Sequence, residues 1–346
     1  MPTELISRYD TIGHRILDLE AELGVFTESH KETLDRLIEE ARKAIHVKGT
    51  YTREDAVGIL RTINSVLQNN GFEQIDREKH IDGLNLFYEG LSSKKIDCDN
   101  TSFIYLSIAD ALKLPIAAVS APEHLFVRFI LNGEEINWET TSAEEIGNDY
   151  YRSLLNISDK AISKGVYLRN LTRQGAMAVV YNKRGIAWAG KGNLDKAIAD
   201  YNEAIRLNPN FAESYNNRAN AWFRKGNLDK AIADYDKAID LNPNYAIAYN
   251  NRGNAWAGKG NLDSAIEDYD AAIRIDPNLA IAYNDRGNAW AGKGNLDKAI
   301  ADYDKAIELD PNYAEAYNNR GVSKLRKLNL IGAGADFMRA VLPILR

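Results

Sequence analysis

Apolar and polar positions in the C-terminal half of the chain repeat with a period of 34 residues. Each unit contains two runs of apolar residues at helical spacing, separated by glycines. In the unit that begins at Ala280, Asn295 is a suitable N-cap for the second run, and Pro311 prevents that helix from continuing. A single helix pair cannot bury its own apolar face, so neighbouring pairs must stack. The pattern therefore predicts an all-α solenoid. Equivalent units begin at Ala178, Ala212, Ala246, Ala280 and Ala314.

The N-terminal half has a different pattern. Apolar residues at helical spacing predict helices within residues 3–47 and over residues 52–69, the second of which begins at Thr52 and ends at Asn70–Gly71. An apolar segment and a polar loop follow, and then a strongly apolar helix over residues 100–112. This part of the chain is expected to hold a globular core of its own.

Strands follow this apolar helix. A strand is predicted over residues 115–121, and residues 124–131 alternate between two faces. Asn132–Gly133 is a strong signal for a hairpin turn, which returns the chain as a further strand over residues 135–140. The N-terminal half therefore reads as an α+β domain.

Thr172 marks the predicted domain boundary, because it is a good N-cap for a long helix that runs into the first unit. The N-terminal domain is assigned to residues 1–171 and the solenoid to residues 172–346. The five units are residues 178–211, 212–245, 246–279, 280–313 and a degenerate cap at 314–346.

Charge and composition argue against a nucleic-acid-binding protein, a disulfide-bonded protein and a membrane protein. The net charge is −6; residues 1–177 hold 20 Lys and Arg against 28 Asp and Glu, and residues 178–346 hold 23 against 21. Neither half is a basic nucleic-acid surface. The single cysteine excludes an intramolecular disulfide and fits a reducing compartment. No signal peptide or membrane span is visible, so we expect a cytoplasmic protein that has no membrane partner.

Neither a cofactor nor a metal site is expected. His14, His30 and His46 lie on amphipathic helices without carboxylate or histidine partners at metal-ligand spacing. The recurring Asn-Leu-Asp segments of the repeats lack the length of a calcium loop and are better explained as helix caps. A recurring Arg and a recurring Asp are expected to pair between the helices of each unit.

One constellation of residues in the N-terminal domain points to covalent chemistry. Cys98 lies at the start of the apolar helix, His124 begins a strand, and Asn137 or Glu139 lies on the returning strand. A helix N-terminus lowers a thiol pKa, an imidazole can take the proton, and a third polar group can orient the ring. The carboxylates of Asp97 and Asp99 would oppose thiolate formation unless they face water or cap the helix.

Residues 84–141 resemble the transglutaminase-like, papain-related core. The residues that carry the resemblance are 97–99, 106–115, 122–128 and 136–140. The resemblance implies Cys98 as nucleophile, His124 as base and Asn137 in the orienting position. It implies a cysteine-dependent amidase, protease or acyltransferase.

The repeats resemble the tetratricopeptide repeat over residues 178–346. The resemblance rests on residues at fixed positions, such as Tyr283, Gly287, Trp290 and Tyr303 in the fourth unit. In this fold the first helix of each pair lines a concave face, so the fifth and ninth residues of each unit would form a double ladder of asparagines. Such amides suit the backbone of an extended peptide. The expected peptide-binding residues are Asn216, Asn220, Phe223, Arg224, Asn250, Asn254, Asn284 and Asn288.

Two functions remain open from the sequence. The first is a module in which the repeats hold a protein or peptide while the cysteine domain hydrolyses or transfers an amide. The second is a non-catalytic scaffold whose N-terminal domain is a degenerate enzyme fold used for interaction. A clamp for chaperone C-termini is disfavoured, because lysine is largely missing from the expected positions. An open repeat edge would allow end-to-end association of copies.

Overall fold

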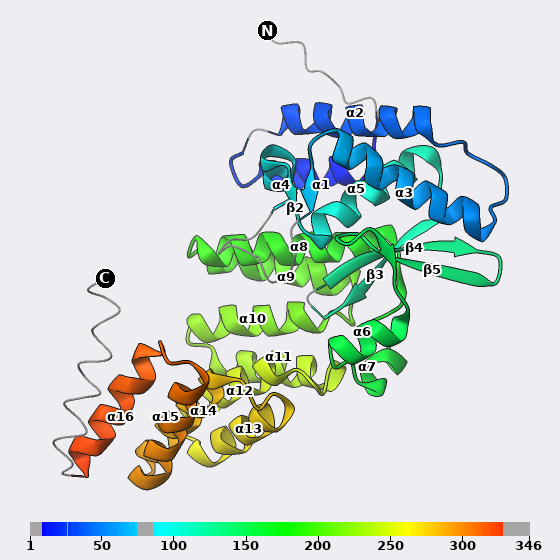
Figure 1. The fold of residues 1–346 in the computed structure, drawn as a ribbon. Helices are drawn as coiled ribbons and strands as arrows, with labels where there is room; N and C mark the ends of the chain where they lie inside the picture. The colour runs from blue at the N-terminus through cyan, green and yellow to red at the C-terminus, as the bar shows by residue number, and fades with distance from the viewer. Residues whose placement is uncertain (1–8, 26, 75–85, 123, 328–346) are drawn as a thin grey trace. The chain divides into compact units, whose positions relative to one another are not determined.

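The computed structural model describes residues 9–25, 27–74, 86–122 and 124–327. The chain forms two compact units, residues 1–214 and 215–346. The first unit extends beyond the predicted boundary at Thr172, because the first repeat packs with the N-terminal domain (Figure 1).

The helices predicted within residues 3–47, over residues 52–69 and over residues 100–112 lie close to their predicted positions. Thr52 and Asp55 form a reciprocal capping box at the start of the third helix, as its sequence indicates. The apolar fifth helix packs against α1, α2 and three strands, which places it in the core of the domain. The helices are α1 (Ile12–Ala21), α2 (Glu28–Ala44), α3 (Arg53–Asn69), α4 (Phe87–Ser93), α5 (Cys98–Leu112), α6 (Asn148–Leu154) and α7 (Asp159–Ser163).

A five-stranded antiparallel sheet has the order β6-β5-β4-β3-β7. The predicted hairpin at Asn132–Gly133 is confirmed, and Gly133 adopts the left-handed conformation that the turn requires (φ +87). Two further short strands, β1 (Glu73–Gln74) and β2 (Lys95–Ile96), pair in parallel. The strands of the large sheet are β3 (Ile116–Ala121), β4 (His124–Leu131), β5 (Glu134–Glu139), β6 (Glu144–Glu145) and β7 (Asn170–Leu171).

Both faces of β4 are covered. Leu125 and Val127 belong to the same apolar core as α5, whereas the Phe126 ring on the opposite face stacks on Tyr151 of α6 with ring centroids 4.2 Å apart. The charged guanidinium of Arg128 is therefore also buried, and it is satisfied by a network of neighbouring polar groups.

The predicted helix pairs are present in the repeats. The first unit of the molecule contains α8 (Arg173–Gly190) and α9 (Leu194–Leu207), and α10 (Ala212–Arg224) begins at its end. Asn193, Asn261 and Asn295 cap their helices through the side chain, as expected, whereas Asn227 makes no such bond. The second unit contains α11 (Leu228–Leu241), α12 (Ala246–Gly258), α13 (Leu262–Ile275), α14 (Ala280–Gly292), α15 (Leu296–Leu309) and α16 (Ala314–Arg326). The rest of the predicted cap lies outside the described residues.

The expected Arg–Asp series is confirmed in the first four repeats. Each pair is bidentate, with both nitrogen–oxygen distances between 2.6 and 2.9 Å, and it joins the first helix of a repeat to the second. Asp336, the expected partner of Arg320, lies outside the described residues. The pairs are Arg184–Asp200, Arg218–Asp234, Arg252–Asp268 and Arg286–Asp302.

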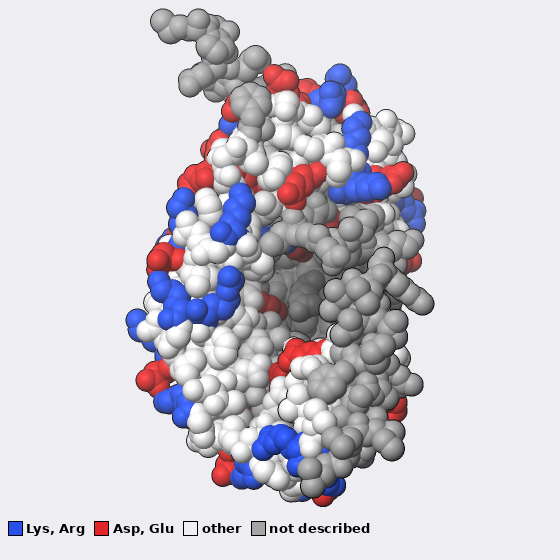
Figure 2. All heavy atoms as spheres, turned by 90° about the vertical axis from the view of Figure 1, so that its left-hand side faces the viewer, with Lys and Arg blue, Asp and Glu red and all other residues white. Residues whose placement is uncertain are grey.

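Acidic and basic side chains are interspersed on the face of the molecule shown in Figure 2, without a large area of one sign. Within the described ranges, no helix combines the length and the apolar character that crossing a bilayer requires.

Candidate functional site

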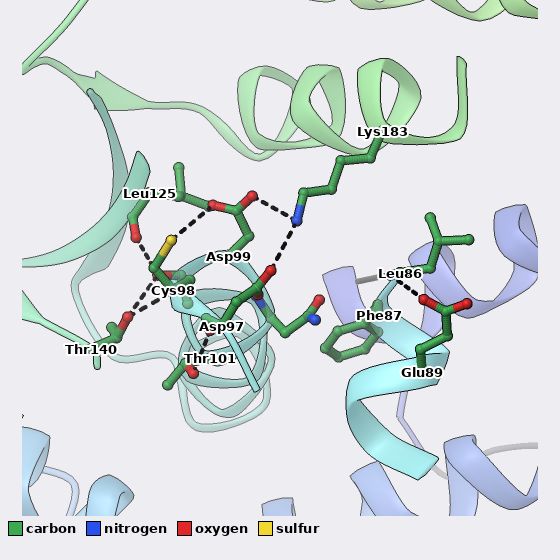
Figure 3. A network of polar contacts seen from close by, with 12 residues as sticks. Leu86, Phe87, Glu89, Asp97, Cys98, Asp99, Thr101, Leu125, Thr140 and Lys183 are labelled. Atoms are coloured by element: carbon green, nitrogen blue, oxygen red, sulfur yellow. Dashed lines mark hydrogen bonds and ion pairs between the residues drawn. The ribbon is translucent and has the colours of Figure 1, made fainter. Parts of the chain in front are cut away.

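Cys98 is the first residue of α5, as the sequence predicts, but its side chain is only 7% exposed. The Asp97 carboxylate caps the helix by accepting a hydrogen bond from the Asn100 backbone amide at 2.8 Å. The Thr140 hydroxyl, at the end of β5, donates to the Cys98 carbonyl at 3.2 Å (Figure 3). These contacts fix the helix start against the sheet and hold the thiol inside the domain.

The surroundings of Cys98 disfavour the thiolate. The thiol donates to the Asp99 carboxylate, with 3.6 Å between Sγ and Oδ1. Burial, followed by the negative charges of Asp99 and Asp97, raises the pKa of Cys98 well above its usual value, although a backbone hydrogen bond from Leu125 and the charge of Lys183 oppose the shift. At neutral pH Cys98 is therefore a protonated thiol.

Lys183 of α8 neutralises the two carboxylates that flank Cys98. Its ammonium lies 2.7 Å from Asp99 Oδ2 and 3.5 Å from Asp97 Oδ2 (Figure 3). Burial lowers the pKa of Lys183, but the charges of Asp97 and Asp99 outweigh burial and raise it above its ordinary value. Both acidic groups are thus satisfied inside the first unit, Asp97 as a helix cap and both as partners of Lys183.

His124 is paired with Glu139 on the neighbouring strand. The distance from His124 Nε2 to Glu139 Oε2 is 2.7 Å, and the same carboxylate accepts hydrogen bonds from Tyr151 (2.8 Å) and Thr141 (2.7 Å). Burial alone would raise the pKa of Glu139, but the hydrogen bond and charge of His124 hold it at about 2. Because Glu139 is ionised at neutral pH, His124 Nε2 must carry a proton and donate it in this bond.

Asn137, the expected orienting residue, belongs to a different network. Its carbonyl oxygen accepts from Arg128 Nε at 2.6 Å, and its amide nitrogen donates to Asn148 at 2.9 Å. The structure therefore brings His124 together with Glu139, the alternative residue on the same strand. No hydrogen bond joins Cys98 to His124 in the part of the chain that the structure describes.

The hairpin register explains this outcome and could have been used to anticipate it. With Leu131 opposite Glu134, counting back along both strands places Arg128 opposite Asn137. Glu139 lies nearer to the beginning of β4, within diagonal reach of His124. Tyr151 and Lys183, which complete the surroundings of His124 and Cys98, come from distant segments that no local pattern connects to them.

The asparagines at the ninth position of the repeats are fixed by tyrosines. Tyrosine hydroxyls from the second helix of the same repeat donate to the side-chain oxygens of Asn220, Asn254 and Asn288 at 2.5–2.8 Å. The amide nitrogen of each asparagine must then point away from its tyrosine. No partner for the amide nitrogens of Asn220 and Asn288 occurs among the described residues, and both side chains retain exposed surface.

The asparagines at the fifth position are buried between adjacent repeats. Asn216 accepts from Asn251 at 3.2 Å, and Asn284 accepts from Asn319 at 3.0 Å. Asn250 donates to Asp285 at 3.0 Å. These three residues of the expected peptide-binding set therefore bind the neighbouring repeat in this structure.

Phe223 and Arg224 end α10, at positions where the third and fourth repeats have Ala and Gly. Both are exposed, and Phe223 retains 36% of its surface. Their role in partner selection stays a prediction.

Comparisons with known proteins concern the repeats. A tetratricopeptide repeat model matches residues 212–245 and 246–279, and a second TPR repeat model matches residues 190–226 and 292–327. No curated protein matches the chain. Among solved structures, MamA from Desulfovibrio magneticus RS-1 is 24% identical over 47% of this chain and 93% of that chain, with a TM-score of 0.43. YrrB, a TPR protein described as having an unusual peptide-binding site, is 23% identical over 47% and 84%, with a TM-score of 0.39. The C-terminal part of this chain is an array of tetratricopeptide repeats.

Proposed function

We propose that this protein is a non-catalytic scaffold whose repeats bind an extended segment of a partner protein. The observation that carries the proposal is the row of ninth-position asparagines, each held in one orientation by a tyrosine hydroxyl. A preorganised amide donor binds a peptide carbonyl with little loss of side-chain entropy. The fifth-position asparagines are buried between adjacent repeats, so the ninth-position asparagines are the ones that remain to bind the peptide.

The N-terminal domain then serves as a structural and interaction domain. A buried, protonated thiol is a poor nucleophile, and Cys98 is both. The ion pairs of Lys183 tie the helix that begins at Cys98 to the first repeat. These contacts support a role for this region in joining the repeats to the domain.

Selection from a phage-displayed random peptide library on the purified full chain tests the proposal. We expect wild-type protein to enrich a set of extended peptides, and the double variant Asn220→Ala and Asn288→Ala to lose most of that binding while remaining folded. Its melting temperature should fall slightly, because the buried hydroxyls of Tyr235 and Tyr303 lose these acceptors. Phe223→Ala is a comparison variant that tests side-chain selectivity separately. The absence of any enriched peptide with wild-type protein would refute the binding function.

A second function, transglutaminase-like thiol acyl transfer, is favoured by one observation. The segments that follow His124 and Glu139 both contact the start of α5, through Leu125 and Thr140. This places a histidine–carboxylate pair next to the helix that carries Cys98. In this alternative, a rearrangement would expose the thiol, His124 would take its proton, and Glu139, rather than Asn137, would orient the ring.

Alkylation of Cys98 by iodoacetamide across a pH series separates the two functions. The chain has no other thiol, so intact-mass measurement reports one site. The scaffold predicts slow alkylation near neutral pH that is unchanged in His124→Ala. Fast alkylation below pH 7 that collapses in His124→Ala would instead establish a Cys–His pair and support acyl transfer.

A further inference from the structure

The sixth residue of the repeat frame departs from asparagine in two repeats. It is asparagine in the second, third and fifth repeats, at positions 217, 251 and 319. It is Lys183 in the first repeat and Asp285 in the fourth. Lys183 has its partners inside the first unit, in Asp97 and Asp99. Asp285 lies in the second unit, and its hydrogen-bond partners are of a different kind.

Asp285 is surrounded by neutral hydrogen-bond donors. Its carboxylate accepts from the side-chain amides of Asn250 and Asn254, both at 3.0 Å, and of Asn284 at 3.3 Å. Within the described part of the second unit, no lysine or arginine forms an ion pair with it. Burial, opposed by these amides and reinforced by the charge of Glu315, raises the pKa of Asp285. Yet Asp285 keeps some exposed surface, so a ligand can reach it.

Two further groups beside Asp285 also present oxygen atoms that can accept a hydrogen bond from a cation. Glu315 is exposed, contacts Asn284 at 3.4 Å, and has no cationic partner among the residues described. Asn250 is only 1% exposed, its amide nitrogen points at Asp285, and its side-chain oxygen has no hydrogen-bond partner in the described part of the chain. The cluster therefore combines two carboxylates with an unused acceptor, and all of these groups are complementary to a cationic donor.

Apolar side chains share the same helix faces. Ile281 precedes Asp285 by one helical turn on α14, and Ile247 precedes Asn250 and Asn254 on α12. Both isoleucines are exposed, at 38% for Ile247 and 42% for Ile281. An acidic site next to exposed aliphatic surface fits a ligand that carries a cation beside apolar groups.

We infer that the cluster of Asp285, Glu315 and Asn250 binds a lysine or arginine side chain of the partner segment, and that aliphatic neighbours of this basic residue contact Ile247 and Ile281. The inference rests on the proposed peptide-binding function and names the chemistry of the peptide. In the described residues of the free repeat array, side-chain amides hold the carboxylate of Asp285. The partner supplies the counter-charge.

The peptide selection described above tests this inference with one further variant. Asp285→Asn installs the residue found at this frame position in three other repeats, so it is expected to fold. Asp297→Asn is a matched control, because it removes one acidic charge from the same unit at an exposed position outside the cluster. We expect peptides selected by wild type to be enriched in lysine or arginine beside aliphatic residues.

The expected effect is selective for charge. Asp285→Asn should weaken binding of a selected basic peptide about tenfold and reduce the dependence of its Kd on salt, whereas Asp297→Asn should change neither. Replacing the basic residue of the peptide with glutamine should abolish the difference between wild type and Asp285→Asn.

The outcomes separate this inference from the proposed function. Enriched peptides without a basic residue, or an unchanged Kd in Asp285→Asn, would overturn the inference and leave peptide binding in place. A failure to enrich any peptide would refute both.

Discussion

Lys183 and Asp285 occupy the same position of the repeat frame and have opposite relations to their surroundings. The Lys183 side chain is 18% exposed, and its ammonium pairs with two carboxylates within its own compact unit. Among the described residues of its unit, Asp285 receives only neutral amide donors. A charged departure from the repeat pattern that is neutralised internally contributes to the fold. A charged departure that is not neutralised internally indicates where a binding partner can supply the opposite charge.

Glu20 in the first unit provides a second comparison with Asp285. Its buried carboxylate accepts hydrogen bonds from the backbone amides of Phe87 (2.8 Å) and Tyr88 (2.9 Å), at the start of α4. Burial raises the pKa of Glu20 to about 7, although these bonds and the charge of Lys183 oppose the shift. Neutral donors therefore satisfy the geometry of a buried carboxylate without fully stabilising its charge.

The largest effect is expected for Lys183→Asn, which introduces the residue found at this position in other repeats. The substitution removes the ammonium that pairs with the carboxylates of Asp97 and Asp99. It should lower the free energy of unfolding of the first unit by about 3–5 kcal/mol. Urea unfolding followed by circular dichroism, with hydrogen exchange of the α5 amides, measures this loss.

Lys293→Asn is the control for Lys183→Asn. Lys293 pairs with Asp263 at the surface, and removing this pair should change the free energy of unfolding by less than about 1 kcal/mol. Adding Asp97→Asn and Asp99→Asn to Lys183→Asn should recover much of the stability, because asparagine also caps helices and the two charges that Lys183 neutralised are then absent as well. If Lys183→Asn and Lys293→Asn lowered the free energy of unfolding equally, Lys183 would be no more important to the fold than a surface lysine, and the contrast with Asp285 would not hold.

Glu20 predicts a pH dependence of stability. Its pKa is about 7 in the folded protein, against an ordinary value of 4.5, so between these values the folded state binds more protons than the unfolded state. The free energy of unfolding therefore falls as the pH rises from 4.5 to 7, by about 3 kcal/mol at most from this group, and is then level. Urea titrations at several pH values should show that Glu20→Gln removes this slope.

Lys183→Asn provides a second test of the pH dependence that is assigned to Glu20. Since the charge of Lys183 lowers the pKa of Glu20, its removal should raise the upper end of the pH window of the slope, while the lower end stays at 4.5. A pH dependence that is identical in wild type and Glu20→Gln would show that Glu20 is not the titrating group.

Periodic and local features of this chain could be predicted from the sequence, because they depend on neighbouring residues. The helix pairs, the capping box at Thr52 and the hairpin at Gly133 are of this kind. The surroundings of Cys98 could not be predicted in this way, because they depend on residues that are distant in sequence. Lys183 lies 86 positions from Asp97 in sequence, and only packing of the first repeat against the domain brings them together. The sequence offered one hint, a lysine where the other repeats have asparagine or aspartate.

The candidate catalytic residues show the same limit. Cys98 was correctly placed at a helix start, but the helix dipole is opposed by burial and by two carboxylates, so the local argument for a low thiol pKa does not decide the outcome. Glu139 rather than Asn137 meets His124 because of the strand register, which the hairpin turn already implies. Burial of the fifth-position asparagines depends on how adjacent repeats pack, and the frame alone does not contain that information.

The smallest and most discriminating effect concerns Asp285 without any ligand. Asp285→Asn removes a partly buried carboxylate that has no cationic partner among the described residues, so we expect the free energy of unfolding of the second unit to stay constant or to rise by about 0.5–1 kcal/mol. Asp302→Asn is the opposite case in the next helix. It removes the bidentate partner of Arg286, which keeps its second ion pair with Asp270, and should be destabilising by about 2 kcal/mol. Thermal and urea unfolding of the two variants at pH 7.5 measures the contrast. A residue that lowers stability in the free protein while it strengthens peptide binding serves the ligand. If Asp285→Asn proved as destabilising as Asp302→Asn, Asp285 would instead be a structural residue of the array, and its neutral donors would be sufficient partners.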